Sequence, residues 1–246
     1  MPPNKIPASI LLIFLFLLNP AWADVMSPHA KSKEVSDLID TATLKQLKPA
    51  LKLFKKAISI EPDCPDIYYW RAITLESNGY YTLALRDINK AVRIAPEDIA
   101  NYAVRSRILF HLSRYEDALK DTEVVYKSPL NYKEKDNTHK RVEGMCLYHL
   151  GRYEEATWSL YGGQGDGDGG ACTEALYYLG LCYLKLSQPQ KALKYFNLAI
   201  NYLPENARHE YYLGRAEAFE KLGKMKLAAQ DRKTAVKIPK RMWGTF

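Results

Sequence analysis

The sequence predicts an all-α fold in which antiparallel helix pairs are stacked as a solenoid. Three observations predict it: alanines that recur at one interval, a second small residue on the same helix face, and a turn residue ahead of each alanine. The recurring alanines are Ala50, Ala84, Ala118, Ala156, Ala192 and Ala228, at spacings of 34 to 38 residues. Such intervals are typical of stacked repeats, in which one helix pair cannot bury its apolar face without its neighbours.

The alanines mark the second helix of each repeat. Seven residues after them come further small or β-branched residues, namely Ala57, Ala91, Val125, Ala199 and Ala235, with an exception at Gly163. Residues four positions after the alanines are mostly larger, as in Phe54 and Phe196. Offsets of four and seven lie on one helix face, so the small residues allow close helix approach and the larger ones fill the remaining space. Prolines twelve positions after three of the alanines are expected to end their helices.

A turn and a first helix precede each second helix. Five residues before the last five alanines stand Gly79, Ser113, Gly151, Ser187 and Gly223. A short connection between two helices needs such residues to reverse the chain. Upstream, each apolar first helix carries one small residue: Ala72, Ser106, Gly144, Gly180 or Ala216.

At these positions the chain resembles the tetratricopeptide repeat (TPR) family. The stretch from Tyr68 to Pro96 carries the family pattern at Tyr68, Ala72, Leu75, Gly79, Tyr81, Ala84, Ile88, Ala91 and Pro96. The resemblance implies a right-handed superhelical solenoid over residues 33–240. Its repeats are expected at about 33–64, 65–98, 99–135, 136–171, 172–207 and 208–240. The first of them keeps Ala50, Phe54, Ala57 and Pro62 but has a degenerate first helix.

A correlation within the chain supports this alignment. Three first helices carry an arginine at the same place, and an aspartate follows each one sixteen residues later on the second helix. The pairs are Arg71 with Asp87, Arg105 with Asp121, and Arg215 with Asp231. Where the arginine is replaced, by Glu143 or Leu179, the aspartate is replaced too. A guanidinium fork meets a carboxylate with two hydrogen bonds, so we expect structural ion pairs between the helices of a repeat. The functional alternative is that these arginines bind an acidic ligand.

Residues 1–23 read as a secretory signal peptide, and residues 24–32 as a linker. Lys5 precedes an apolar run from Ile10 to Leu18, and the small-x-small site Ala21, Trp22, Ala23 follows. The run is too short to span a bilayer but suits a signal cleaved after Ala23. Export to the periplasm or the medium is therefore expected, with retention as an uncleaved anchor as the alternative. No cysteine follows the cleavage site, so a lipoprotein anchor is not indicated.

The net charge of the chain and its C-terminal residues indicate which kinds of partner it could bind. The formal net charge is +7, and from Ala207 to Phe246 there are ten Lys or Arg residues against four Asp or Glu. The basic last repeat, at about 208–240, is suited to binding an anionic envelope surface. The alternative is that its charged residues only form a solvated helix face. Nucleic acid does not fit export, and no nucleic-acid-binding signature is present. The tail at 241–246 either covers the last repeat or leaves a docking surface, so the oligomeric state stays open.

Four cysteines raise the question of disulfides. Cys146 and Cys182 occupy equivalent places in successive first helices, where a small core residue is expected. Cys172 lies beside a glycine-rich loop, and its pairing with Cys146 is the first bridge to test. Cys64 has no obvious partner. No metal site is predicted, because ligands at short zinc spacing are missing from the sequence.

The glycine-rich loop, residues 162–170, interrupts the fourth repeat. Glycines lose too much backbone entropy to remain helical, so the loop is expected to replace the last turns of a second helix and to act as a hinge. Asp166 and Asp168 resemble the start of a calcium loop, but the twelfth position counted from Asp166 holds Tyr177 in place of glutamate.

The TPR resemblance implies a concave groove lined by the first helices. The residues expected to bind a partner there are Tyr69, Arg107, Phe110, His111, Arg141, Met145, Tyr148, His149, Tyr177, Leu181 and Lys185. Aromatic side chains give apolar contact at low entropic cost, and Arg or Lys pairs with acidic groups or carbonyls. This combination favours an extended peptide or a helix, with acidic character as one option.

Enzyme motifs are missing: the sequence holds no nucleophile elbow, zinc motif or phosphate-binding glycine loop. We therefore expect an exported, non-enzymatic scaffold or adaptor that needs no cofactor and binds another protein in its groove. The alternative is a structural subunit of a cell-envelope assembly, bound through the edges or ends of the solenoid.

Overall fold

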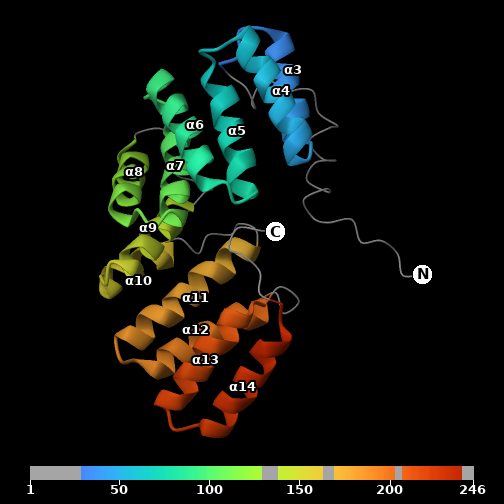
Figure 1. Ribbon diagram of the computed structural model, residues 1–246. Helices are drawn as coiled ribbons and strands as arrows, with labels where there is room; N and C mark the ends of the chain where they lie inside the picture. The colour runs from blue at the N-terminus through green and yellow to red at the C-terminus, as the bar shows by residue number, and fades with distance from the viewer. Residues whose placement is uncertain (1–28, 129–137, 163–168, 203–206, 240–246) are drawn as a thin grey trace, which may run out of the picture. The chain divides into compact units, whose positions relative to one another are not determined.

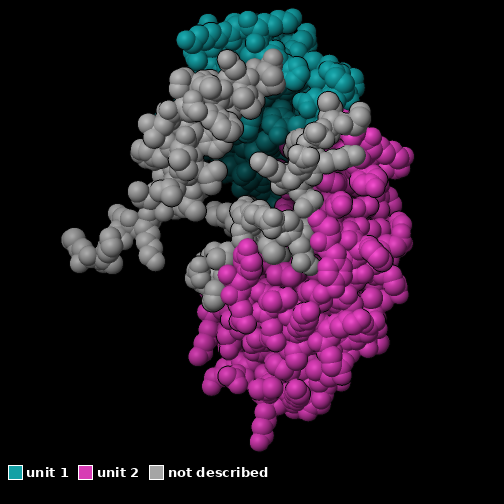
Figure 2. Space-filling view, turned by 180° about the vertical axis from the view of Figure 1, so that it is seen from behind, with its two compact units in different colours: residues 1–101 teal, residues 102–246 magenta. Residues whose placement is uncertain are grey.

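The computed structural model describes residues 29–128, 138–162, 169–202 and 207–239 (Figure 1). Within these ranges the regular secondary structure is α-helical and contains no strand, as expected for an all-α fold. The chain forms two compact units, residues 1–101 and residues 102–246, which Figure 2 shows in separate colours. We refer to them as unit 1 and unit 2 and describe each by itself.

The described part of unit 1 contains two helix pairs. The first pair is α3 (Lys33–Thr43) with α4 (Leu47–Ile60), and the second is α5 (Pro65–Ser77) with α6 (Tyr81–Ile94). Each helix packs on the next along the chain. Phe54 of α4 is fully buried among Val35, Ile39 and Ile67 from the neighbouring helices. Two helix pairs thus share one apolar cluster.

Helix α3 is regular although its sequence departs from the repeat pattern. Ser32 caps its N-terminus, where the Ser32 Oγ accepts a hydrogen bond of 3.3 Å from the Val35 N–H. Val35, Ile39 and Ala42 recur at offsets of four and three, so they share one face, and all three are buried. The degenerate first helix is therefore a regular helix of 11 residues, slightly shorter than α5, which has 13.

Unit 2 contains four helix pairs, the first of which begins inside unit 1. The pairs are α7 (Ile99–His111) with α8 (Tyr115–Lys127), α9 (Thr138–His149) with α10 (Tyr153–Gly162), α11 (Gly169–Lys185) with α12 (Pro189–Tyr202), and α13 (His209–Lys221) with α14 (Met225–Lys237). Second helices pack on the next pair, as α10 does on α11 and α12 on α13. First helices also touch each other, α9 with α11 and α11 with α13, so they share one side of this unit.

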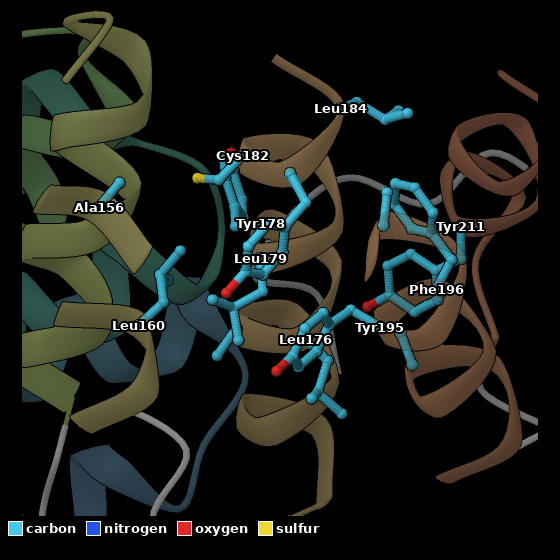
Figure 3. Packing of buried hydrophobic residues seen from close by; sticks show 14 of the residues in the cluster. Ala156, Leu160, Leu176, Tyr178, Leu179, Cys182, Leu184, Tyr195, Phe196 and Tyr211 are labelled. Carbon is cyan, nitrogen blue, oxygen red and sulfur yellow. The ribbon is translucent and has the colours of Figure 1, made fainter. Parts of the chain in front are cut away.

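The core of unit 2 centres on α11 (Figure 3). Ala156 and Leu160 point from α10 toward α11, and Phe196 of α12 lies beside Tyr211 of α13. All six recurring alanines of the chain are buried, with at most 2% of their surface exposed. The small residues of the first helices explain the close packing: a Cβ added at Gly144 would lie 2.5 Å from Leu160 Cγ.

The five expected turn residues adopt the left-handed backbone conformation. Gly79, Gly151 and Gly223 have φ of 79°, 79° and 71°, while Ser113 and Ser187 have φ of 58° and 57°. The chain needs a positive φ at this place to reverse direction within a short connection. The turn prediction is confirmed at each position.

All three Arg–Asp pairs are present and bidentate. Arg71 donates from Nε and Nη2 to Asp87 at 2.6 and 2.8 Å. The pairs of Arg105 with Asp121 and of Arg215 with Asp231 repeat this geometry at 2.7 to 2.8 Å. Each guanidinium also lies over the tyrosine three residues before it, Tyr68, Tyr102 or Tyr212, at 5.1 to 5.5 Å. The motif is thus a Tyr–Arg–Asp triad that ties the two helices of a repeat together.

In the repeat at 172–207 tyrosine replaces the aspartate of this triad. Tyr195 of α12 is stacked on Tyr183 of α11, with ring centroids 5.4 Å apart and planes 11° apart. Its hydroxyl also contacts the hydroxyl of Tyr161 on α10. Aromatic stacking here joins the helices that an ion pair joins elsewhere.

Several sequence predictions lie partly outside the described residues. Residues 1–23, the loop segment 163–168 and the tail at 241–246 are among them, so the signal peptide, the calcium alternative and the covering tail stay predictions. Cys64, Cys146 and Cys182 are buried free thiols, but the side chain of Cys172 is not described, and its pairing with Cys146 also stays a prediction. Helix α10 ends at Gly162 after 10 residues, whereas α6 and α12 each have 14. Among the described residues, no helix combines the length and apolar character needed to cross a membrane.

Candidate functional site

Most residues that the sequence predicts for partner binding lie on the first helices of unit 2. Arg107, Phe110 and His111 belong to α7, Arg141, Met145, Tyr148 and His149 to α9, and Tyr177, Leu181 and Lys185 to α11. Tyr69 lies on α5 in unit 1, where its ring meets Trp70 edge to face at 5.2 Å. The structure brings several of the residues of unit 2 into two groups, one aromatic and one charged.

The aromatic cluster consists of Phe110, Tyr115, Tyr148, His149, Tyr153 and Tyr178, from helices α7 to α11. Phe110 contacts His149 across α7 and α9 with ring centroids 5.7 Å apart. Tyr148 meets Tyr178 of α11 edge to face at 5.4 Å. Burial raises the pKa of Tyr148 to about 12, so its phenol stays neutral over the physiological range. The cluster thus offers neutral rings, each with an apolar face and a polar edge.

His149 occupies the middle of the aromatic cluster. Its ring is stacked on Tyr115, with centroids 4.7 Å apart and planes 3° apart, and its Nε2 lies 3.3 Å from the Tyr178 hydroxyl. Desolvation among these rings lowers the pKa of His149 below the ordinary value of 6.5. The imidazole is therefore mainly neutral at pH 7. His111, its expected equivalent on α7, contacts Phe110 at 5.6 Å.

The arginine cluster surrounds Glu174 near the start of α11. The Arg141 Nε of α9 lies 3.5 Å from a Glu174 carboxylate oxygen, with 14% and 22% of the two side chains exposed. Burial raises the pKa of Glu174, and the charges of Arg141, Arg208 and Arg107 oppose that rise. The buried Nε of Arg141 has no hydrogen-bond partner. One carboxylate thus lies within the field of three arginines.

Arg208 extends the arginine cluster to the start of α13. Its Nε lies 3.6 Å from Glu210, and His209 Nδ1 lies 3.1 Å from the same carboxylate oxygen. The charges of Arg107, Arg141 and Arg208 all act on Glu174, and Glu210 lies beside Arg208. We define the arginine cluster as these five residues.

Tyr177 and Tyr178 connect the two clusters. Tyr177 contacts Tyr211 of α13 at 5.1 Å, and Tyr178 contacts Tyr148 of the aromatic cluster. Burial raises the pKa of both phenols, and the charge of Glu210 adds to the rise for Tyr177 and that of Glu174 to the rise for Tyr178. The aromatic and arginine clusters therefore adjoin on the side of unit 2 that the first helices share.

Met145 is a wrong prediction. Its side chain has 3% of its surface exposed and belongs to the apolar core with Leu176 and Leu179 of α11. The unbranched thioether fills the space where α9 packs on α11, although its position along the helix matches that of half-buried Arg107. Leu181 is half-buried against the same core, while Lys185 is exposed.

The residues that the sequence predicts for partner binding do not include six members of these clusters: Tyr115, Tyr153, Tyr178, Glu174, Arg208 and Glu210. Glu174 and Arg208 lie close to the repeat boundaries. The repeats were aligned on the alanines of their second helices, so equivalent positions are least certain at these boundaries. Tyr115 and Tyr153 lie on second helices, outside the groove that the sequence predicts on the first helices. A signal for Glu174 did exist, because Glu174 and Glu210 are 36 residues apart, the spacing of the last repeats. Among the described residues, no group of three or more potential ligands is arranged to hold a metal ion.

Two family models, both described as tetratricopeptide repeat, match residues 44–99 and residues 173–206. These segments include α4 to α6 in unit 1 and α11 with α12 in unit 2. The chain contains tetratricopeptide repeats in both units. Proteins of this family are scaffolds for interaction with other proteins or peptides, so the TPR helix pairs define this chain as a protein-interaction scaffold. No curated protein sequence matches it significantly.

Solved TPR structures share the fold at low sequence identity. PilW, described as a widely conserved type IV pilus biogenesis factor, is 14% identical with a TM-score of 0.72, over 82% of this chain and 92% of PilW. YrrB, described as a TPR protein with an unusual peptide-binding site, is 19% identical with a TM-score of 0.58, over 87% and 97%. PilF of Pseudomonas aeruginosa is 19% identical with a TM-score of 0.60, over 72% and 78%. These likenesses show the fold.

Proposed function

We propose that this TPR protein is an exported, non-enzymatic adaptor that binds an extended peptide or helix of another protein on the first helices of unit 2. The observation that carries the proposal is that α11 holds both Glu174 of the arginine cluster and Tyr178 of the aromatic cluster, whose ring contacts Tyr148. Side chains of both kinds are enriched at the energetic centres of protein interfaces.

The physical properties of the two clusters suit a peptide ligand. Phe110, Tyr148 and Tyr177 are half-buried and packed against other rings, so little rotamer entropy remains to be lost when a ligand covers them. Their exposed edges give apolar contact, and the arginines can donate to ligand carbonyl or carboxylate groups. YrrB, described as a TPR protein with an unusual peptide-binding site, is a protein of this fold that binds a peptide.

The export part of the proposal rests on residues 1–23. The apolar run and the Ala21, Trp22, Ala23 site support cleavage by a signal peptidase. The test is intact-mass measurement of the protein recovered from a bacterial host. A chain that begins at Asp24 in the extracytoplasmic fraction is expected, and a full-length chain in the cytoplasm would contradict export.

The binding part is tested by affinity capture with three forms of the chain. The site variant carries Arg107→Ala, Phe110→Ala, Arg141→Ala and Tyr148→Ala. The control variant changes the same numbers of arginines and aromatics outside the two clusters, by Arg114→Ala, Arg152→Ala, Tyr126→Ala and Trp158→Ala. Tyr126 and Trp158 have 61% and 82% of their surface exposed, so the control should remain folded. Circular dichroism of both variants checks this.

A partner recovered with the wild type and the control variant, but not with the folded site variant, supports the adaptor. A partner recovered equally with all three forms contradicts binding at the two clusters. That result favours the alternative of a structural envelope subunit bound through other surfaces. PilW, which its description links to pilus biogenesis, has this fold and is a reason to carry out the capture in an intact envelope fraction.

A further inference from the structure

We propose that α14 docks this protein on a lipid bilayer, where its lysines bind anionic headgroups and the apolar side chains beside them enter the headgroup region. This surface is separate from the site of the proposed function. The aromatic and arginine clusters lie on α7 to α11 and at the start of α13, whereas α14 is the last described helix of unit 2. Lipid binding there does not depend on peptide binding at the two clusters.

Three exposed lysines form one strip along α14. Lys233 and Lys237 follow Lys226 by about two and about three helical turns, so the three side chains leave the helix on the same face. The buried residues Ala228 and Ala235 lie on the opposite face, toward the core. We define the lysine strip as Lys226, Lys233 and Lys237.

Within the described part of the chain, the lysine strip forms no ion pair. The ion pairs of α13 and α14 join Arg215 to Asp231 and Arg232 to Glu220, at 2.7 and 2.8 Å. Anionic headgroups attract such lysines, and each lysine close to the bilayer surface increases the affinity about fivefold. A layer of acidic headgroups presents many negative charges to one side of a helix, so it complements the whole strip.

Two large apolar side chains lie next to the lysine strip. Met225 and Val236 have 63% and 87% of their surface exposed, and about three turns separate them, so they share the flank of α14 beside the lysines. Ile200, at the place of Val236 on α12, is only 5% exposed because α13 packs on α12. Helices that lie in the membrane interface combine a lysine-rich face with such apolar side chains.

The outer side of α14 is poorly suited to a further repeat or a second copy of the chain. Phe196, four positions after the recurring alanine of α12, packs against Gly214 of the next first helix. The same place on α14 holds Arg232, which donates to Glu220 at 2.8 Å. A packed helix pair would withdraw this ion pair from water at a cost in free energy, whereas the headgroup region leaves it hydrated.

The sequence after the described residues continues the same combination of side chains. Lys240 and Arg241 add positive charge, and Met242, Trp243 and Phe246 are apolar or aromatic. Tryptophan is enriched at the boundary between a membrane and water. The alternative is that these residues cover Met225 and Val236.

The test measures cosedimentation of the protein with lipid vesicles. One kind of vesicle is phosphatidylcholine alone, and the other is an equal mixture of phosphatidylcholine and phosphatidylglycerol. We expect at least about tenfold tighter binding to the mixed vesicles at low salt, and a smaller preference at high salt. Binding through the apolar run at residues 10–18 would not distinguish the two kinds of vesicle, and all variants are compared in the same processed form.

Two triple variants with equal loss of charge locate the binding. The strip variant carries Lys226→Gln, Lys233→Gln and Lys237→Gln, and it should bind the mixed vesicles about tenfold or more weakly. The control variant removes three exposed lysines from one face of α4, by Lys48→Gln, Lys52→Gln and Lys55→Gln. The most exposed large apolar side chain of α4 is Ile60, at 38%. The control should bind within about twofold of the wild type, since α4 does not contact the bilayer in this arrangement.

The apolar side chains and the wild-type contact are tested separately. Met225→Gln with Val236→Gln should weaken binding about threefold or more and leave its salt dependence unchanged. In the wild type, acetylation by acetic anhydride, located by mass spectrometry, should be reduced on the lysine strip by mixed vesicles but not on the lysines of α4. This measurement reports on the surface directly even if a variant is unstable.

Several results would overturn lipid docking by α14. Equal binding to both kinds of vesicle, or no binding at millimolar lipid, excludes a preference for anionic headgroups. Equal losses with the strip variant and the control variant mean that only the net charge matters. Binding that appears only after removal of residues 241–246 assigns the apolar flank to the tail. A captured protein partner that is lost with the strip variant, without any vesicle binding, assigns α14 to a protein.

Discussion

Phe196 of α12 packs so closely on Gly180 of α11 that a Cβ at Gly180 would lie 2.5 Å from the ring Cε1. The same ring would lie 2.7 Å from a Cβ at Gly214 of α13. One aromatic ring thus fills the space between two successive first helices, and it does so because both present glycine to it.

Gly180→Ala is expected to destabilise the protein by about 1–2 kcal/mol. Overpacking costs about 1–3 kcal/mol, which outweighs the gain of up to about 1 kcal/mol in helix propensity. Urea unfolding measures the change. In a Phe196→Leu background the cost of Gly180→Ala should shrink, and an equal cost in both backgrounds would contradict the steric explanation.

Asp87→Ala is expected to cost more than replacement of both members of its pair. The Asp87 side chain is 3% exposed and that of Arg71 is 18% exposed, so the single substitution leaves a largely buried arginine without its acceptor. The expected loss is about 2–4 kcal/mol. The double variant Arg71→Met with Asp87→Leu should lose less, as measured by thermal unfolding. As a control, Arg152→Ala breaks the exposed pair between Arg152, which precedes α10, and Glu155, and should stay within about 0.5 kcal/mol of the wild type.

Protonation of His149 is expected to lower stability in acid. Burial lowers its pKa from 6.5, so between pH 6.5 and the folded-state pKa the unfolded chain binds more protons than the folded one. The free energy of unfolding is therefore highest above pH 6.5 and falls as the pH is lowered toward the folded-state pKa. Urea unfolding at several pH values measures this dependence. His149→Phe should remove the part of this pH dependence that comes from His149. If the free energy of unfolding of this variant keeps the wild-type slope between pH 6.5 and 5, the dependence comes from other groups.

Ser113→Gly and Ser187→Gly are expected to stabilise the protein. Both serines have positive φ, a conformation that strains an L-residue by about 1–2 kcal/mol. Glycine removes this strain but has more entropy in the unfolded chain, so the net gain should be about 0.5–1 kcal/mol each. Calorimetry checks this. The reverse change, Gly151→Ala at φ 79°, should destabilise although no atom lies within 4 Å of the added Cβ.

Periodicity predicted what depends on helix geometry alone. The buried alanines, the five left-handed turn residues and the Arg–Asp pairs recur in phase, so one alignment placed them all. The tyrosine of each triad could also have been predicted, because it precedes its arginine by three residues on the same helix face.

Which side chains of neighbouring helices contact one another was harder to predict. Met145 shares a repeat position with Arg107, yet a flexible apolar side chain turns into the core and an arginine does not. Glu174 was missed because its importance depends on charges from three other helices. Such contacts join residues far apart in the chain, and the 36-residue interval between Glu174 and Glu210 is a weak signal because only the last two repeats carry it.

The Tyr–Arg–Asp triads have a kinetic consequence. Each one joins residues no more than 19 positions apart, from Tyr68 to Asp87 in the best-matched repeat. Closing so short a loop costs little entropy, so a helix pair can acquire its strongest polar contacts before the rest of the chain is ordered. Folding of this protein can therefore begin at more than one place along the chain and spread from there to the neighbouring repeats.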